Sequence, residues 1–108
     1  MIIGTTMAKL DGNPYYSPAF PKGGDAAVFS VQIVNFSATS LTVTVQHRTA
    51  EETTWTDAGT FTSITTIGLA TKDISGLKEL VRFKFLVNGS NVYDAVHVFV
   101  PPPSWRPN

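Results

Sequence analysis

The sequence predicts an all-β protein, a single antiparallel β-sandwich of about seven or eight strands with an immunoglobulin-like or jelly-roll-like arrangement. Three observations lead to this prediction. Apolar residues recur at every second position in several segments, as they do in strands that bury one face. Turn-forming residues separate these segments at intervals of roughly 8 to 12 residues. No segment shows a sustained 3.6-residue apolar repeat, so no long helix is expected.

The two clearest strands are expected around residues 27–33 and 41–48. In both segments, apolar side chains alternate with polar ones. Residues 35–40, between them, are rich in turn formers. Two alternating segments joined by a short polar turn are typical of a hairpin, so we expect these two strands to pair.

The remaining strands follow from the same pattern. A short strand is expected over residues 55–61, with residues 69–74 as its candidate partner. Residues 81–87 alternate clearly and form the next strand. Residues 88–91 begin with Asn-Gly, which tolerates the positive φ of tight turns, and they carry the strongest hairpin signal. We expect residues 92–100 to complete that hairpin.

Both ends of the chain are expected to be extended arms. Prolines are frequent in residues 14–21 and open the tail at residues 101–103, and proline has no N–H to donate to a sheet. The predicted organisation is therefore an N-terminal arm at residues 1–24, a β-sandwich at 25–100 and a proline-aromatic tail at 101–108.

The side chains of these arms are the candidates for an interface. Apolar surface left in water costs about 25 cal/mol per Å², so each ring packs either on its own domain or on a neighbour. Trp105 lies in the tail, where internal burial is harder, whereas Trp55 is expected in the sandwich core. The predicted interface comprises Tyr15, Tyr16, Phe20, Trp105 and Arg106.

Composition narrows the class of partner. The chain has zero formal net charge and only 15% charged residues, against about a quarter in typical proteins. Without a basic excess we expect no nucleic-acid partner, and without an apolar run of about 18 residues we expect no membrane span. The start has no basic region, so no signal peptide is expected. A weakly charged surface eases association with copies of the chain.

No catalytic or metal-binding motif is apparent. His47 and His97 lack the local spacing of a zinc site, and the chain contains no cysteine. His47 is expected at a strand end, bonded to a backbone group, and His97 on a sheet face. Most acidic residues fall in expected turns, and no glycine loop precedes a helix. We therefore expect a non-enzymatic protein with no catalytic residues, no cofactor and no metal.

Three segments carry a family resemblance: VTVQHR at 43–48, TTWTDAGTF at 53–61 and ISGLKELVRFKF at 74–85. Their layout resembles the small β-sandwich virion proteins of tailed bacteriophages that decorate or cement capsids, over roughly residues 25–100. The resemblance implies a structural virion protein, synthesised in the host cytoplasm. Its implied partners are the major capsid protein and copies of itself, in a homo-oligomer for which a trimer is one option.

The Trp-then-Val-Arg layout also resembles discoidin-like and fibronectin-like sandwiches, which bind sugars or proteins. The alternative function is therefore a carbohydrate-binding module, with Tyr15, Tyr16 or Trp105 as a stacking platform, or a tail or fibre adhesion component. Arg82 and Lys84 alternate with core residues, so we expect them on a solvated sheet face.

Overall fold

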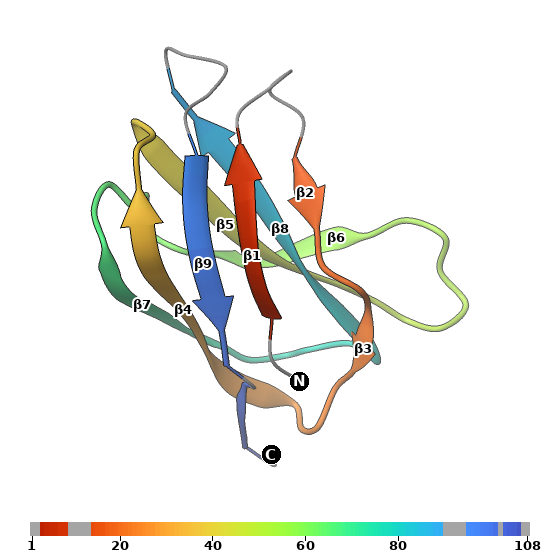
Figure 1. Cartoon of the computed structure of the whole chain (residues 1–108). Coiled ribbons are helices and arrows are strands. Elements are labelled where there is room, and N and C mark those ends of the chain that lie inside the picture. Colours follow the sequence, from red (N-terminus) through yellow and green to blue (C-terminus); the bar gives the residue numbers. More distant parts are fainter. Residues whose placement is uncertain (1–2, 9–13, 90–94, 102, 107–108) are drawn as a thin grey trace.

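The computed structural model describes residues 3–8, 14–89, 95–101 and 103–106, the first of these ranges by its backbone alone. These residues form ten strands in two antiparallel sheets that face each other (Figure 1). The predicted all-β sandwich is confirmed. The described residues include no helix long and apolar enough to cross a membrane.

Sheet A is built around its long strand β4. One edge of β4 pairs with β7, and its other edge pairs first with β10 and further along with β9, which in turn pairs with β1. The strands of sheet A are β1 (Ile3–Ala8), β4 (Ala26–Phe36), β7 (Gly68–Ile74), β9 (Ala95–Val100) and β10 (Ser104–Arg106).

Sheet B is built around β5 and β8, which pair without interruption from Ser40↔Asn88 to Arg48↔Leu80. The free edge of β5 pairs with β6, and that of β8 pairs with two very short strands, β2 and β3. The strands of sheet B are β2 (Tyr15–Tyr16), β3 (Phe20–Pro21), β5 (Ser40–Arg48), β6 (Thr56–Thr60) and β8 (Leu80–Asn88).

The core lies between the sheets and is filled by the alternate residues of their long strands. In β8 every second side chain, from Val81 to Val87, is buried, and β4 does the same from Ala27 to Ile33. The period-two prediction is therefore confirmed for residues 27–33 and 81–87. In residues 41–48 the predicted apolar face is buried, but Thr44 and Gln46 of the polar face are buried as well. The largest fully buried side chains are Phe29, Phe83 and Leu41.

The predicted strand pairings are wrong at three places. Strands β4 and β5 were expected to form a hairpin, yet they lie in different sheets, and so do β8 and β9. Strand β7 pairs with β4 in place of β6. A turn signal specifies that the chain reverses, but either a hairpin or a crossing to the other sheet buries the same alternate face. Residues 90–94, which include part of the predicted Asn-Gly turn, lie outside the described residues.

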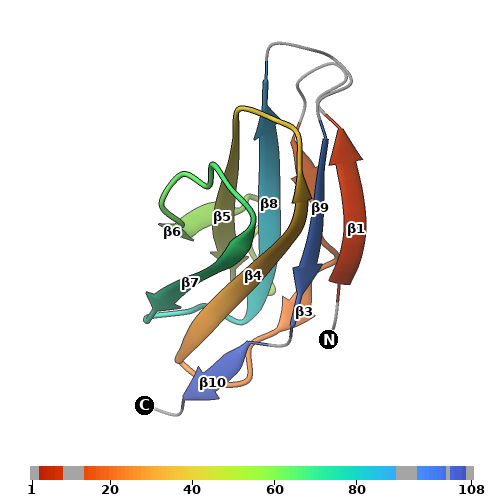
Figure 2. The same cartoon turned by 60° about the vertical axis from the view of Figure 1, so that its left-hand side comes forward.

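The two expected arms also differ from the structure, because parts of both are strands of the sandwich. Strand β1 pairs with β9, β2 and β3 pair with β8, and β10 pairs with β4. Pro21 lies in β3 at the edge of sheet B, where only one side of the strand pairs, and this is the position at which sheets accept proline. Figure 2 shows β10 lying beside the start of β4.

Candidate functional site

Three of the five predicted interface residues pack against the core of their own subunit. The Trp105 ring contacts Phe20 and Phe29 edge-on, with ring centroids 6.3 and 6.0 Å apart. Phe20 in turn lies 6.1 Å from the core ring of Phe83, and Tyr15 also packs against the core. The alternative that the sequence left open, packing on the parent domain, therefore describes Phe20, Trp105 and Tyr15.

Two glycines make room for the C-terminal strand. A Cβ atom at Gly23 would lie 2.7 Å from the Trp105 ring, and one at Gly24 would lie 2.5 Å from the carbonyl oxygen of Arg106. Both distances are too short for real atoms, so β10 sits where it does because these two residues have no side chain. Strand β10 thus packs directly against the backbone of Gly23 and Gly24.

The other two predicted residues are at the surface. Arg106 forms an exposed ion pair with Asp73 of β7. Tyr16 is 49% exposed, and its register partner in β8 is Lys84, an outward-facing residue. Tyr16 therefore lies on the outer face of sheet B. An interface role stays a prediction for both residues.

The outer face of sheet B carries a cluster of cations and rings. The guanidinium carbon of Arg82 lies 4.1 Å from the ring centroid of Tyr16 and 4.5 Å from that of Trp55. The guanidinium carbon of Arg48 lies 5.1 Å from the same Trp55 centroid. We call these four residues, Tyr16, Arg48, Trp55 and Arg82, the arginine–aromatic cluster. Each contact has the geometry of a cation–π interaction.

The prediction that Trp55 is a core residue is wrong. Strict alternation puts Trp55 on the same face as Phe61, which is buried. However, the pairing of β6 with β5 shifts between Gln46↔Asp57 and Val45↔Gly59, so β6 has one extra residue there. Such a bulge reverses the face on which the preceding residues lie, and Trp55 consequently meets the outward-facing Arg48.

A buried amide holds Arg82 in place. The Oε1 atom of Gln46 accepts a hydrogen bond from Nε of Arg82 at 2.9 Å, and its Nε2 donates to Asp57 at 3.0 Å. Gln46 is only 8% exposed although it lies on the outer face, so the cluster and its surroundings cover it. Because both ends of the amide are bonded, the orientation of Gln46 is determined, and with it that of the Arg82 side chain.

The positive charges of the cluster influence one another. Partial burial lowers the pKa of Arg82, the charge of Arg48 lowers it further, and the neighbouring Tyr16 opposes both effects. Among the described residues, neither arginine is in an ion pair. Arg48 instead donates to backbone carbonyl groups of residues 49, 50 and 52.

Sequence reasoning missed Arg48, Gln46 and the outward position of Trp55. The first two, like Arg82, occupy polar positions of strands that were correctly predicted. The missing information is the cross-strand register, since Gln46 and Arg82 are opposite each other in the β5–β8 pair. Had those two strands been aligned, the neighbouring polar side chains on one face would have indicated the cluster.

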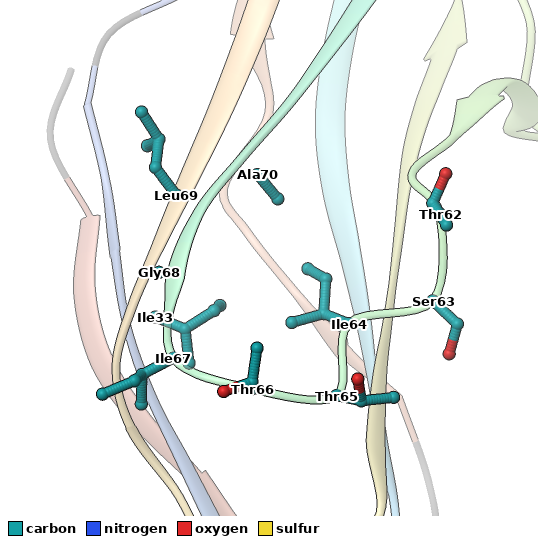
Figure 3. A pocket seen from close by; sticks show the side chains of 10 residues that line it. All are labelled: Ile33, Thr62, Ser63, Ile64, Thr65, Thr66, Ile67, Gly68, Leu69 and Ala70. Atoms are coloured by element: carbon teal, nitrogen blue, oxygen red, sulfur yellow. The ribbon is translucent and has the colours of Figure 1, made fainter.

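A second surface feature lies at the β4–β7 edge of sheet A. The loop before β7 encloses a hollow of about 260 Å³, towards which Ile33, Ile64 and Ala70 point, whereas Leu69 points away (Figure 3). Leu69 and Ile67 are 67% and 59% exposed. On the outer face Leu69 and Phe99 flank Gln32, their common register partner. The residues around the hollow are a mixture of apolar side chains and small hydroxyl side chains, and none of them is charged.

Other candidate chemistry is sparse. His47 accepts a hydrogen bond at Nδ1 from the backbone N–H of Lys78 at 3.3 Å, which confirms the predicted backbone partner. His97 lies on the outer side of β9, between buried neighbours, as predicted for a sheet-face residue. Within the described ranges no three His, Cys, Asp or Glu side chains come together as a metal site would require.

Comparison with known proteins adds no family to these observations. No protein-family model, no curated protein and no solved structure matches this chain.

Proposed function

We propose that this chain is a non-enzymatic structural protein that docks on a larger assembly through the outer face of sheet B. The kind of role is that of a virion protein that decorates or cements a capsid, as the resemblance of roughly residues 25–100 to such proteins implies. Its partners in this proposal are the major capsid protein and further copies of the chain.

The observation that carries the proposal is the arginine–aromatic cluster. Trp, Tyr and Arg are the residue types most enriched among those that dominate binding energy at protein interfaces. Here Arg82 contacts both Tyr16 and Trp55 at the surface, and Gln46 holds the arginine by a hydrogen bond. Side chains that are already ordered lose less conformational entropy when a partner binds, which favours affinity.

A second surface supports contact between copies. The exposed apolar side chains Ile67, Leu69, Val34 and Phe99 lie on or beside strands β4, β7 and β9 of the other sheet. Exposed apolar groups that gather at one place are typical of protein–protein contact. The two sheets would thus offer two different surfaces, an arginine–aromatic one for the shell and an apolar one for copies of the chain, with a trimer as one possible oligomer.

The test is attachment to capsid shells of the virus whose genome encodes the chain. Purified chain is mixed with shells that lack it, and bound chain is measured by co-sedimentation and located by electron microscopy. We expect saturable binding that is lost in a Tyr16→Ala, Trp55→Ala double variant. The matched control is Lys72→Gln, an exposed change on the edge of the other sheet, which should bind as the unchanged chain does. Absence of binding by the unchanged chain would remove the proposal.

One observation favours the alternative of carbohydrate binding. Tyr16 presents a half-exposed ring on an open sheet face beside Arg82 and opposite Lys84, and sugars stack on such rings. Trp105 no longer serves as a platform, because its ring packs on Phe20 and Phe29. Binding of a neutral glycan on an array, lost in Tyr16→Ala, would favour this module or a tail-fibre adhesion role over the capsid role.

A further inference from the structure

We propose that Arg48 and Arg82 form a carboxylate-binding site, and that its occupant is an aspartate or glutamate side chain of the protein on which sheet B docks. This inference rests on the proposed docking function and specifies the chemistry of the partner.

The first step is the juxtaposition of like charges. Both guanidinium groups lie against one indole ring, 5.1 and 4.5 Å from its centroid. The charge of Arg48 acts unfavourably on that of Arg82, and burial of Arg82 increases the cost because less water screens its charge. The Trp55 ring offsets part of this repulsion through its negative faces. An anion bound by the two arginines would offset the remainder.

The second step concerns two acidic side chains close in sequence to the cluster. Glu52 is bound to Lys78, whose Nζ lies 3.2 Å from one carboxylate oxygen, and it also accepts from the backbone N–H of Thr49. Asp57 accepts from Gln46. In the described part of the chain, Glu52 and Asp57 therefore have other partners, and no ion pair joins a carboxylate to either arginine. This leaves the two arginines open to a carboxylate from another molecule.

The third step is the geometry of the remaining donors. Within the described residues, Arg82 uses only Nε in its hydrogen bonds, to Gln46. Its two terminal nitrogens are therefore available to donate to a ligand. Because the planar guanidinium group lies over the Tyr16 ring, these two nitrogens have a fixed orientation. The spacing of such donors matches the two oxygens of a carboxylate. The Arg48 side chain is similarly held, by the backbone carbonyl groups around residue 50.

The composition of the face favours a protein partner over a polyanion. A nucleic acid or an acidic polysaccharide is held by a long row of cations, whereas this chain has zero net charge, and Lys84 is the one cation that β8 adds beside the two arginines. One or two carboxylates surrounded by aromatic side chains correspond instead to the centre of a protein interface, where arginine, tyrosine and tryptophan gather.

The experiment is a titration of the full chain with a hexaglutamate peptide at low salt, followed by NMR of the arginine Nε–H signals. We expect the Arg82 signal to shift in a saturable manner. The affinity should fall about tenfold or more in Arg82→Gln, and by a similar factor in Arg82→Lys, which keeps the charge but loses the planar pair of donors. Lys72→Gln, which removes an equal charge elsewhere, should stay within about twofold. Urea unfolding of each variant confirms that it is folded.

Several outcomes would overturn the inference. One is that hexaglutamate does not shift the Arg82 Nε–H signal. Another is that Arg82→Gln and Lys72→Gln lower the affinity for the peptide equally. A third is that Arg82→Lys binds the peptide as tightly as the unchanged chain does. Inorganic phosphate or polygalacturonate binding more tightly than the peptide, in an Arg82-dependent manner, would assign the site to another anion. The shell experiment distinguishes the two proposals: shells bound equally by Arg82→Gln would remove only the carboxylate site. If the unchanged chain binds the peptide but does not bind capsid shells, only the capsid role would be removed.

Discussion

The two tryptophans occupy environments opposite to those that their sequence positions suggest. Trp105, in a proline-rich tail, is packed against Phe20 and Phe29 at the edge of the core. Trp55, at the start of a strand within the domain body, lies on the outside of sheet B against Arg48 and Arg82. Position along the chain is thus a poor guide to burial here, whereas strand register is a good one.

The two rings are therefore held in place by different kinds of contact. Trp105 is held by apolar contacts and by the space left at Gly23 and Gly24, so its removal opens a gap beside the core. Trp55 is held by two cations at the surface, so its removal leaves a site that water can fill. The predictions below test this contrast, from the largest expected effect to the smallest.

The largest effect is expected for Trp105→Ala. Loss of a large ring packed on Phe20 and Phe29 should lower the free energy of unfolding by about 3 kcal/mol. This value is at the lower end of the range for substitution of buried tryptophans, because Trp105 is partly exposed. The matched change Trp55→Ala should cost about 1 kcal/mol, the scale of exposed cation–π contacts. Urea unfolding of both variants measures the two values. Equal costs would contradict the contrast between the two rings.

An intermediate effect is expected for Gly24→Ala. Its new Cβ would collide with the Arg106 carbonyl oxygen, a backbone atom that moves only with the whole strand β10. We expect a loss of about 2 kcal/mol, typical of overpacking. In a chain ending at Pro103 the same substitution should cost almost nothing, because the colliding strand is gone. A cost that persists in the shortened chain would show that Gly24 does not act through β10.

The smallest effect is a pH dependence that arises at His47, near the end of β5. Burial lowers the pKa of His47, and the charge of Lys78 adds to this, while Glu52 opposes it. The hydrogen bond from the Lys78 backbone requires an unprotonated Nδ1. Its contribution is therefore complete above the unfolded pKa of about 6.5, and it is lost as the pH falls from there through the lower folded pKa.

We expect the urea midpoint to fall slightly more on acidification, from about pH 7.5 to 5, in the unchanged chain than in His47→Asn, which has no imidazole to protonate. NMR titration of the His47 ring supplies the folded pKa directly. A value above the usual one for histidine would contradict the expectation.

The fold class and the core could be predicted because both depend on local alternation. Phe29, Val43 and Phe83 are buried where the period-two pattern predicts. The candidate site could not be predicted in the same way. It needs β8 to lie next to β5, β2 to lie on the far side of β8, and a bulge to turn Trp55 outward. None of these is a local property of a segment.

By itself, the sequence determined that this is a β-sandwich and which face of each long strand is buried, because apolar side chains alternate and water excludes them. Only the tertiary structure decided which strands are neighbours, that the proline-containing ends join the sheet edges, and that Arg82 meets Tyr16 and Trp55. The physical reason is that burial of an alternate face has nearly the same free energy in several strand orders. The choice among them comes from the fit of distant parts, such as the Trp105 ring above Gly23.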